Sequence, residues 1–263
     1  MIKKLLYILL SLALAAGLAV LLGFAASNNL QTPCHRFEIE VISRSGNHFI
    51  RAENIRQLAT GKLDTLEGKV VGPELLGKLH GIVNNIPYVD KASVYRTING
   101  ELKAEATLRD PLLRIINSNN QSYYIDTQGT MFPLSDEYTA RVMLATGRIT
   151  TDYSPGFNVL PSKETKEASP GTETLYDLVR LATFIAGDDF WNAFIDHIVV
   201  LPNGKFELTP KNGVHIIEFG EATNIEKKFG KLRKFYANGL SRTGWYHYNR
   251  VNVEFKQQVI CSR

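Results

Sequence analysis

The sequence predicts an α+β protein with a single N-terminal transmembrane helix, a small β-α-α-β-β module and a C-terminal mixed β domain with flanking helices. Three observations support this: an apolar run at 5–26, a strand and helix pattern over 37–109, and short strands after residue 110. The 263 residues are 44% hydrophobic and 21% charged, which excludes a wholly disordered chain. Since a globular domain typically has about 150 residues, a chain of this length can form one or two domains.

The segment 5–26 contains no charged residue and is apolar apart from one Tyr and one Ser. At about 1.5 Å of rise per residue, a helix of this length would cross about 30 Å of hydrocarbon. Lys3 and Lys4 precede it, and no Lys, Arg, Asp or Glu follows before Arg36. The positive-inside rule then predicts a cytoplasmic tail at 1–4 and export of the rest. A cleaved signal peptide is the alternative, although its apolar region is usually only about 7–15 residues long.

Alternation and helical spacing predict the first exported module, which we place at 37–109. Pro73 suits the first turn of a helix, and Asn99-Gly100 is a strong hairpin signal. A small antiparallel sheet covered by two helices would satisfy the layer rule for one compact domain. The predicted elements are a strand at 37–41, helices at 50–59 and from residue 73, and strands at 89–96 and 101–108.

Asp110-Pro111 marks the start of a second domain at 110–263, in which short strands dominate. Residues 150–172 are rich in Ser, Thr, Pro and Gly and predict a long loop. Asn238-Gly239 is the predicted C-cap of the last helix. The predicted elements are strands at 113–117, 122–126 and 141–146, a helix at 175–185, a meander at 195–201, 206–209 and 214–219, and a helix at 225–236.

The last segment, from Val251, alternates apolar and polar residues as far as Lys256 and contains no Gly or Pro. Strands average about 5–6 residues, so one of roughly a dozen would overhang its neighbour. Because this run also ends the sequence, we expect it to lie at a sheet edge.

No motif for catalysis or metal binding is present. The six histidines form no close-spaced metal pair, and the sequence has no G-x-S-x-G, GxGxxG or P-loop pattern. Asp196 and His197 are adjacent on a predicted strand and would point to opposite faces. With 30 basic and 26 acidic residues, the net positive charge is too small to indicate binding to nucleic acid. We expect no catalytic residue, no metal, no cofactor and no nucleic-acid partner.

A family resemblance is most specific near the C-terminus. The segments that carry it are 229–236 (FGKLRKFY), Gly239-Leu240, Gly244-Trp245, 248–251 and 258–263, with weaker matches at 124–126, Gly129, 132–134, 184–185 and 189–191. Through these segments the chain resembles the FtsQ/DivIB bacterial cell-division proteins over its whole length.

The resemblance implies a POTRA-like domain at 37–109 beside the membrane and a β domain at 110–263. It implies a non-enzymatic divisome scaffold that links early and late division proteins. The expected location is the inner membrane, as a single-pass protein with a cytoplasmic N-terminus, a periplasmic bulk and enrichment at the division septum. The expected partners are FtsB (DivIC) and FtsL coiled-coil proteins, bound through the last strand, and other divisome components, bound through the POTRA module and membrane helix.

An exposed strand edge offers unpaired N–H and C=O groups to which a partner strand can add. The resemblance places the basic run 227–234 beside that strand, and this run is either a patch for an acidic partner segment or a solvated helix face. The candidate partner-binding residues are Tyr248, Arg250, Asn252, Val253, Glu254, Phe255, Lys256, Gln258 and Ile260 on the terminal run, and Lys227, Lys231, Lys234, Tyr236 and Trp245 around the basic helix.

Two other functions are possible from the sequence. The first is a POTRA-bearing component of envelope assembly or protein export, which would normally carry repeated POTRA modules. The second is an anchored cell-wall enzyme, which would need a nucleophile with its base or a metal site.

Overall fold

The computed structural model describes residues 4, 7, 9–20, 33–97, 99–160, 171–211, 215–240, 244 and 247–263. The chain forms two compact units. Unit 1 comprises Met1–Ser43 and Ile50–Leu108, and unit 2 comprises Arg44–Phe49 and Arg109–Arg263. Both units combine strands and helices, so the predicted α+β class is confirmed.

The predicted transmembrane segment at 5–26 is described only in part. Residues 9–20 are helical and exposed, and the rest of the segment apart from Tyr7 lies outside the described residues. Within the part of the chain that is described, no helix is both long and apolar enough to cross a membrane. The anchor at 5–26 thus remains a prediction from the sequence.

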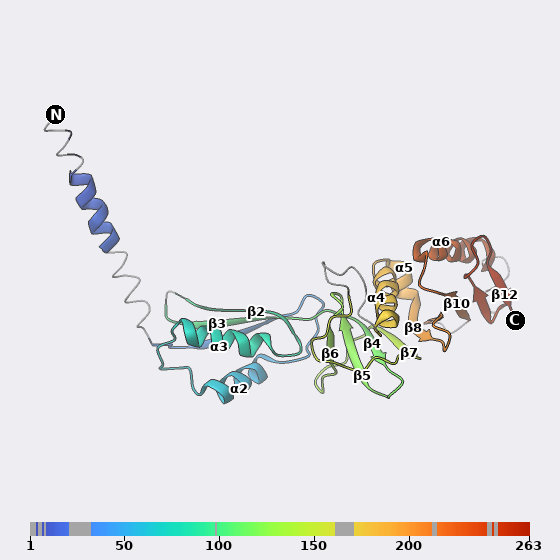
Figure 1. Ribbon diagram of the computed structural model, residues 1–263, viewed down its shortest axis with the longest axis horizontal. Helices are drawn as coiled ribbons and strands as arrows, with labels where there is room; N and C mark the ends of the chain where they lie inside the picture. The colour runs from blue at the N-terminus through green and yellow to red at the C-terminus, as the bar shows by residue number, and fades with distance from the viewer. Residues whose placement is uncertain are drawn as a thin grey trace. The chain divides into compact units, whose positions relative to one another are not determined.

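Unit 1 has the element order β-α-α-β-β (Figure 1). Ile55 and Ala59 of the first helix and Leu79 and Val83 of the second are buried in one apolar core with the sheet. Helical spacing of apolar residues therefore places one face of each helix against the sheet. The elements are β1 (Phe37–Ile42), α2 (Ala52–Leu63), α3 (Pro73–Asn84), β2 (Val89–Arg96) and β3 (Leu102–Leu108).

The sheet of unit 1 is mixed, which corrects the predicted antiparallel sheet. Its strand order is β1-β3-β2. β2 and β3 pair antiparallel, as expected for a hairpin at Asn99-Gly100, but β1 pairs parallel with β3. The two helices and β2 separate β1 from β3 in sequence, and a connection of that length permits a parallel pair.

Unit 2 is built on one sheet of nine strands in the order β12-β11-β10-β9-β8-β7-β4-β5-β6. The predicted meander of β8, β9 and β10 is confirmed, since each pairs antiparallel with the next. The strands are β4 (Pro111–Ile116), β5 (Ser122–Asp126), β6 (Met131–Pro133), β7 (Met143–Gly147), β8 (Ile195–Val200), β9 (Phe206–Pro210), β10 (Ile216–Gly220), β11 (Arg250–Asn252) and β12 (Ile260–Ser262).

Helices pack on the core of unit 2 around Phe229. The Phe229 ring lies 4.8 Å from Trp191, 4.9 Å from Phe184 and 5.2 Å from Phe219, measured between ring centroids. These contacts join three helices and β10, so the last helix is fixed to the sheet by aromatic packing. The helices are α4 (Glu173–Ala186), α5 (Asp189–Phe194) and α6 (Ile225–Phe235), which continues as the π-helical turn η1 (Tyr236–Leu240).

Two predictions about the end of the chain are wrong. The run from Val251 is not one long strand but two short antiparallel strands, β11 and β12, separated by a bend at 255–257. Val251 and Val253 are fully buried, whereas 255–258 are exposed. Burial of the two valines holds the first residues of the run in the sheet, and solvent exposure of the following residues favours a turn. Asn238-Gly239 is not the cap of α6, because the helix continues through these residues as η1.

Candidate functional site

The two edge strands of the nine-stranded sheet, β6 and β12, differ in what covers them. The outer side of β6 is covered by residues 156–159, here called the covering segment. Met131 N–H donates to the Phe157 carbonyl at 2.8 Å, and Gly156 N–H donates to the Met131 carbonyl at 3.2 Å. Val159 N–H donates to the Gly129 carbonyl at 2.9 Å. The main-chain groups of Met131 and the Gly129 carbonyl at this edge are therefore used inside the molecule.

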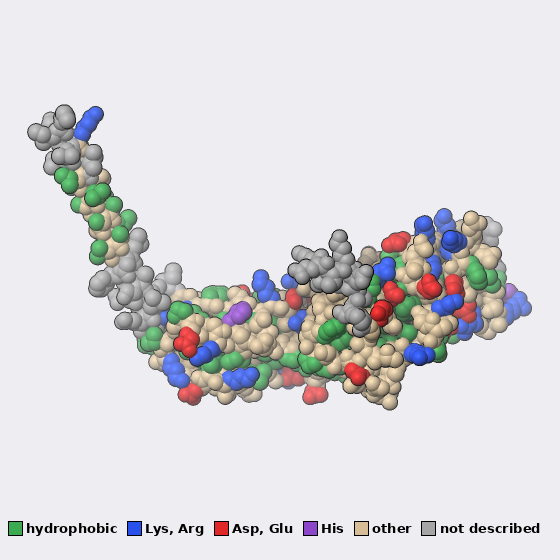
Figure 2. Space-filling model, in the orientation of Figure 1, with side chains coloured by type: hydrophobic (Ala, Val, Ile, Leu, Met, Phe, Trp, Pro, Cys, Tyr) green, Lys and Arg blue, Asp and Glu red, His purple; other side chains and the backbone are tan. Residues whose placement is uncertain are grey.

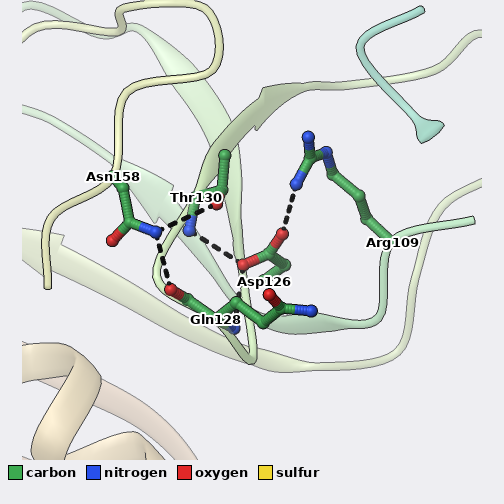
Figure 3. Close-up of polar contacts among 5 residues, drawn as sticks. All are labelled: Arg109, Asp126, Gln128, Thr130 and Asn158. Atoms are coloured by element: carbon green, nitrogen blue, oxygen red, sulfur yellow. Dashed lines mark hydrogen bonds and ion pairs between the residues drawn. The ribbon is translucent and has the colours of Figure 1, made fainter. Parts of the chain in front are cut away.

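A buried carboxylate orders the β5–β6 turn that receives the covering segment (Figure 3). Asp126 is 2% exposed, and one of its oxygens accepts hydrogen bonds from Gln128 N–H at 2.9 Å and Thr130 N–H at 2.8 Å. Its other oxygen pairs with Arg109 at 2.8 Å. Asn158 Nδ2 reaches the same turn and donates to the Gln128 carbonyl at 2.9 Å.

Gly129 in this turn allows the covering segment to approach. Its φ is +82°, in the region that favours glycine. A Cβ atom there would lie 2.5 Å from Leu160 Cγ and 3.0 Å from Asn158 Oδ1. Both the turn and the closed edge thus require a residue without a side chain.

The outer side of β12 has no pairing strand among the described residues, because its one neighbour in the sheet is β11. Cys261 is half-buried and packs against the core of unit 2. Ile260 is 44% exposed, and Phe255 in the preceding bend is 47% exposed. β12 therefore presents a main-chain edge with exposed apolar side chains next to it.

Two lysines of α6 bond to neighbouring main-chain segments, and one of these segments leads to β12. Lys231 Nζ donates to the Val253 carbonyl at 2.8 Å and also to the Phe255 carbonyl. Lys228 is 6% exposed, and its Nζ donates to the Phe219 carbonyl at 3.0 Å and lies 4.8 Å above the Phe219 ring. Burial lowers the pKa of both lysines. Each ammonium group is satisfied by carbonyl oxygens of the protein, which is what a buried cation requires.

A cluster of charged side chains joins β9, β10 and β11. Arg250 forms ion pairs with Glu207 and Glu218. Asn252 Nδ2 donates to the other carboxylate oxygen of Glu218 at 2.6 Å. The hydrogen bond from Arg250, helped by that from Asn252, lowers the pKa of Glu218. These contacts stabilise the sheet next to the open edge.

The structure sorts the predicted partner-binding residues into groups. Val253 and Tyr236 are buried, and Tyr236 Oη is bonded to His215 Nε2 at 2.7 Å, so their side chains belong to the core. Trp245 lies outside the described residues. Those engaged with neighbouring groups are Tyr248, Arg250, Asn252, Glu254 and Lys231. Those exposed are Phe255, Lys256, Gln258 and Ile260 on the terminal segment and Lys227 and Lys234 on α6.

Sequence reasoning missed residues that the hairpin brings to this edge. Ser262 lies on β12 itself, and Gln257 lies in the bend beside α6. A single long strand would have placed Gln257 within the strand, so only the bend reveals its position. Within the described ranges, no group of three or more His, Cys, Asp or Glu side chains is arranged to hold a metal ion.

Two comparisons with known proteins bear on this arrangement. The family model described as FtsQ/DivIB, C-terminal related, matches residues 110–262. A search of curated proteins gave no match. The match includes both edge strands of the nine-stranded sheet.

Proposed function

The chain belongs to the FtsQ/DivIB, C-terminal related family, and from this we propose that it is a non-enzymatic scaffold of bacterial cell division. Its partners are FtsB/DivIC-like and FtsL-like division proteins, and it links early and late components at the septum. Unit 1 acts as a POTRA-like module that contacts other divisome components. The apolar segment 5–26 anchors the chain in the inner membrane with its bulk in the periplasm.

The observation that supports partner binding by strand addition is the difference between the two sheet edges. One edge is occupied by the covering segment, whereas β12 has unpaired main-chain groups on its outer side among the described residues. A partner segment that adds to β12 gains main-chain hydrogen bonds, and exposed neighbours such as Ile260 and Phe255 supply side-chain contacts.

Proline substitutions in β12 test this mechanism. Successive amides of a strand point to opposite sides, so Cys261→Pro and Ser262→Pro remove one amide facing β11 and one facing outward. We expect one of the two variants to lose capture of co-expressed FtsB/DivIC-type and FtsL-type proteins while its melting temperature is unchanged. Cys261→Ala and Ser262→Ala are the matched controls and should retain capture. Normal capture by both proline variants would refute strand addition at β12.

Depletion of the protein separates this proposal from a role in envelope assembly. A division scaffold predicts filamentous cells, because septation fails while growth continues. An assembly or export component predicts envelope stress with defective outer-membrane proteins, and that phenotype without filaments would refute the division role.

A further inference from the structure

A groove runs beside α6 and leads toward β12. It consists of a hollow of about 550 Å³ and an adjoining shallow, open depression of about 400 Å³, here called the first and second hollows, which share Lys231 and Gln257 in their linings. Residues of α6 and η1 form one wall, and residues between Glu254 and Val259 form the other. Figure 2 shows Lys and Arg side chains gathered over α6. The groove therefore joins the basic helix to the segment that enters the open edge strand.

The charge available in this groove is positive. Five lysines and two glutamates line the two hollows, and Glu254 is already paired with Lys205 at 2.6 Å. Lys228 and Lys231 donate to main-chain carbonyls and so serve the fold. The lysines left to meet a ligand are exposed and have no ion pair among the described residues: Lys227, Lys234 and Lys256.

Polar amide side chains also line the groove. Asn224 and Gln257 lie in the first hollow, and Asn238 and Gln258 lie in the second. Asn238 Nδ2 already donates to the Lys234 carbonyl at 3.1 Å, so this residue offers its side-chain oxygen as an acceptor. An amide side chain carries both donors and acceptors and can pair with the main chain of an extended peptide. Free phosphate is mainly a hydrogen-bond acceptor, whereas an extended peptide presents N–H donors and C=O acceptors repeatedly along its length. The succession of amides along the groove therefore favours a polypeptide.

We propose that the groove binds an acidic, extended peptide segment whose carboxylates meet Lys227, Lys234 and Lys256. This inference deepens the proposed function, on which it rests, by giving the chemistry of the partner segment that continues from the strand added to β12. Lys231 is a positioning residue here, because its bonds to Val253 and Phe255 set the distance between the two walls. Complementary charge would also speed the encounter and make it sensitive to salt.

The test uses the full chain in detergent and a fluorescein-labelled peptide of Glu-Thr-Val repeats, with binding measured by fluorescence anisotropy. The groove variant carries Lys227→Gln, Lys234→Gln and Lys256→Gln. The control carries Lys62→Gln, Lys78→Gln and Lys91→Gln, which removes the same charge from exposed lysines of unit 1. Exposed charge pairs are each worth about 1.5- to 5-fold in affinity, so the groove variant should bind about tenfold more weakly and the control should be unchanged.

Three results would overturn the proposal. Equal weakening in the groove and control variants would show a general charge effect. Equal binding of a Gln-Thr-Val peptide would show that carboxylates are not recognised. Phosphatidylglycerol vesicles that bind with the same lysine dependence and displace the peptide would assign the groove to a lipid surface. Because this assay needs no division partner and the proline test needs no acidic peptide, failure of either proposal is recognisable separately.

Discussion

Replacing Asp126 with alanine tests whether the buried carboxylate orders the turn that closes the β6 edge. The change removes the acceptor for two main-chain amides and for Arg109, all within 2.9 Å. A hydrogen bond to a charged group contributes about 1.5–3 kcal/mol, and breaking a buried ion pair costs about 3–5 kcal/mol. Because these contributions overlap, we expect Asp126→Ala to lower the free energy of unfolding by about 3–5 kcal/mol.

Asparagine at the same position separates the hydrogen bonds from the charge. Its side-chain oxygen can still accept the hydrogen bonds from the Gln128 and Thr130 amides. Its neutral amide group, however, cannot replace the negative charge that pairs with Arg109. We therefore expect Asp126→Asn to cost about 1–2 kcal/mol, less than the alanine variant.

Thermal unfolding followed by tryptophan fluorescence measures both effects in unit 2. Both tryptophans of the chain lie in unit 2, so unit 1 does not contribute to the signal. At about 2–4 °C per kcal/mol for a unit of this size, Asp126→Ala should lower the melting temperature by about 6–20 °C. Asp136→Ala, at an exposed loop position, is the control. A shift for Asp126→Ala as small as that of the control would refute the role given to the carboxylate.

Three further predictions concern acid stability, autonomy and the anchor. The contacts of Glu218 lower its pKa below 4.5, so their stabilisation is full above pH 4.5 and is lost as the pH falls through the folded-state pKa. The melting temperature of the native chain should therefore fall more steeply below pH 4.5 than that of Glu218→Gln, and parallel curves would contradict this. A fragment of residues 37–109 should unfold cooperatively when purified alone, because it contains its own buried core; a transition without cooperativity would place the domain boundary elsewhere. The protein isolated from membranes should keep residues 1–26, and a mass that lacks about 25 N-terminal residues would indicate a cleaved signal peptide instead.

Local signals were sufficient to predict much of the fold. Pro73 begins α3, Asn99-Gly100 lies between β2 and β3, and alternation locates the meander of β8 to β10. Each of these signals depends on the conformational preferences of a few neighbouring residues, which can be read directly from the sequence.

The terminal hairpin could not be predicted in the same way. Alternation from Val251 to Phe255 is typical of a strand, and the bend at 255–257 contains none of the usual turn residues. It forms because Val251 and Cys261 pack against one core, a contact between residues that are separated along the chain. The parallel pairing of β1 with β3 could not be predicted for a similar reason. Whether two strands pair parallel or antiparallel depends on which strand becomes the neighbour, and here that strand is far away in sequence.

The lysines of α6 show a second limit of sequence reasoning. Their spacing indicates a basic helix face, but a lysine stem is long enough to carry its ammonium group to the interior or to solvent. Carbonyl acceptors on β10 and in the 253–255 segment engage Lys228 and Lys231, whereas Lys227 and Lys234 remain exposed. Composition therefore predicts the number of charges, and only the structure shows which of them a ligand can meet.

Closure of the β6 edge also limits how many strands the nine-stranded sheet can accept from other molecules. A sheet with two open edges can accept a strand at each end, and identical molecules could then join without limit, as in heterologous assemblies that do not close. In the described part of the nine-stranded sheet, the covering segment occupies one end, so a strand added at β12 has no counterpart at β6. Under the proposed mechanism, strand addition by this sheet would therefore be monovalent: one segment would add per molecule, and no polymer would propagate from it.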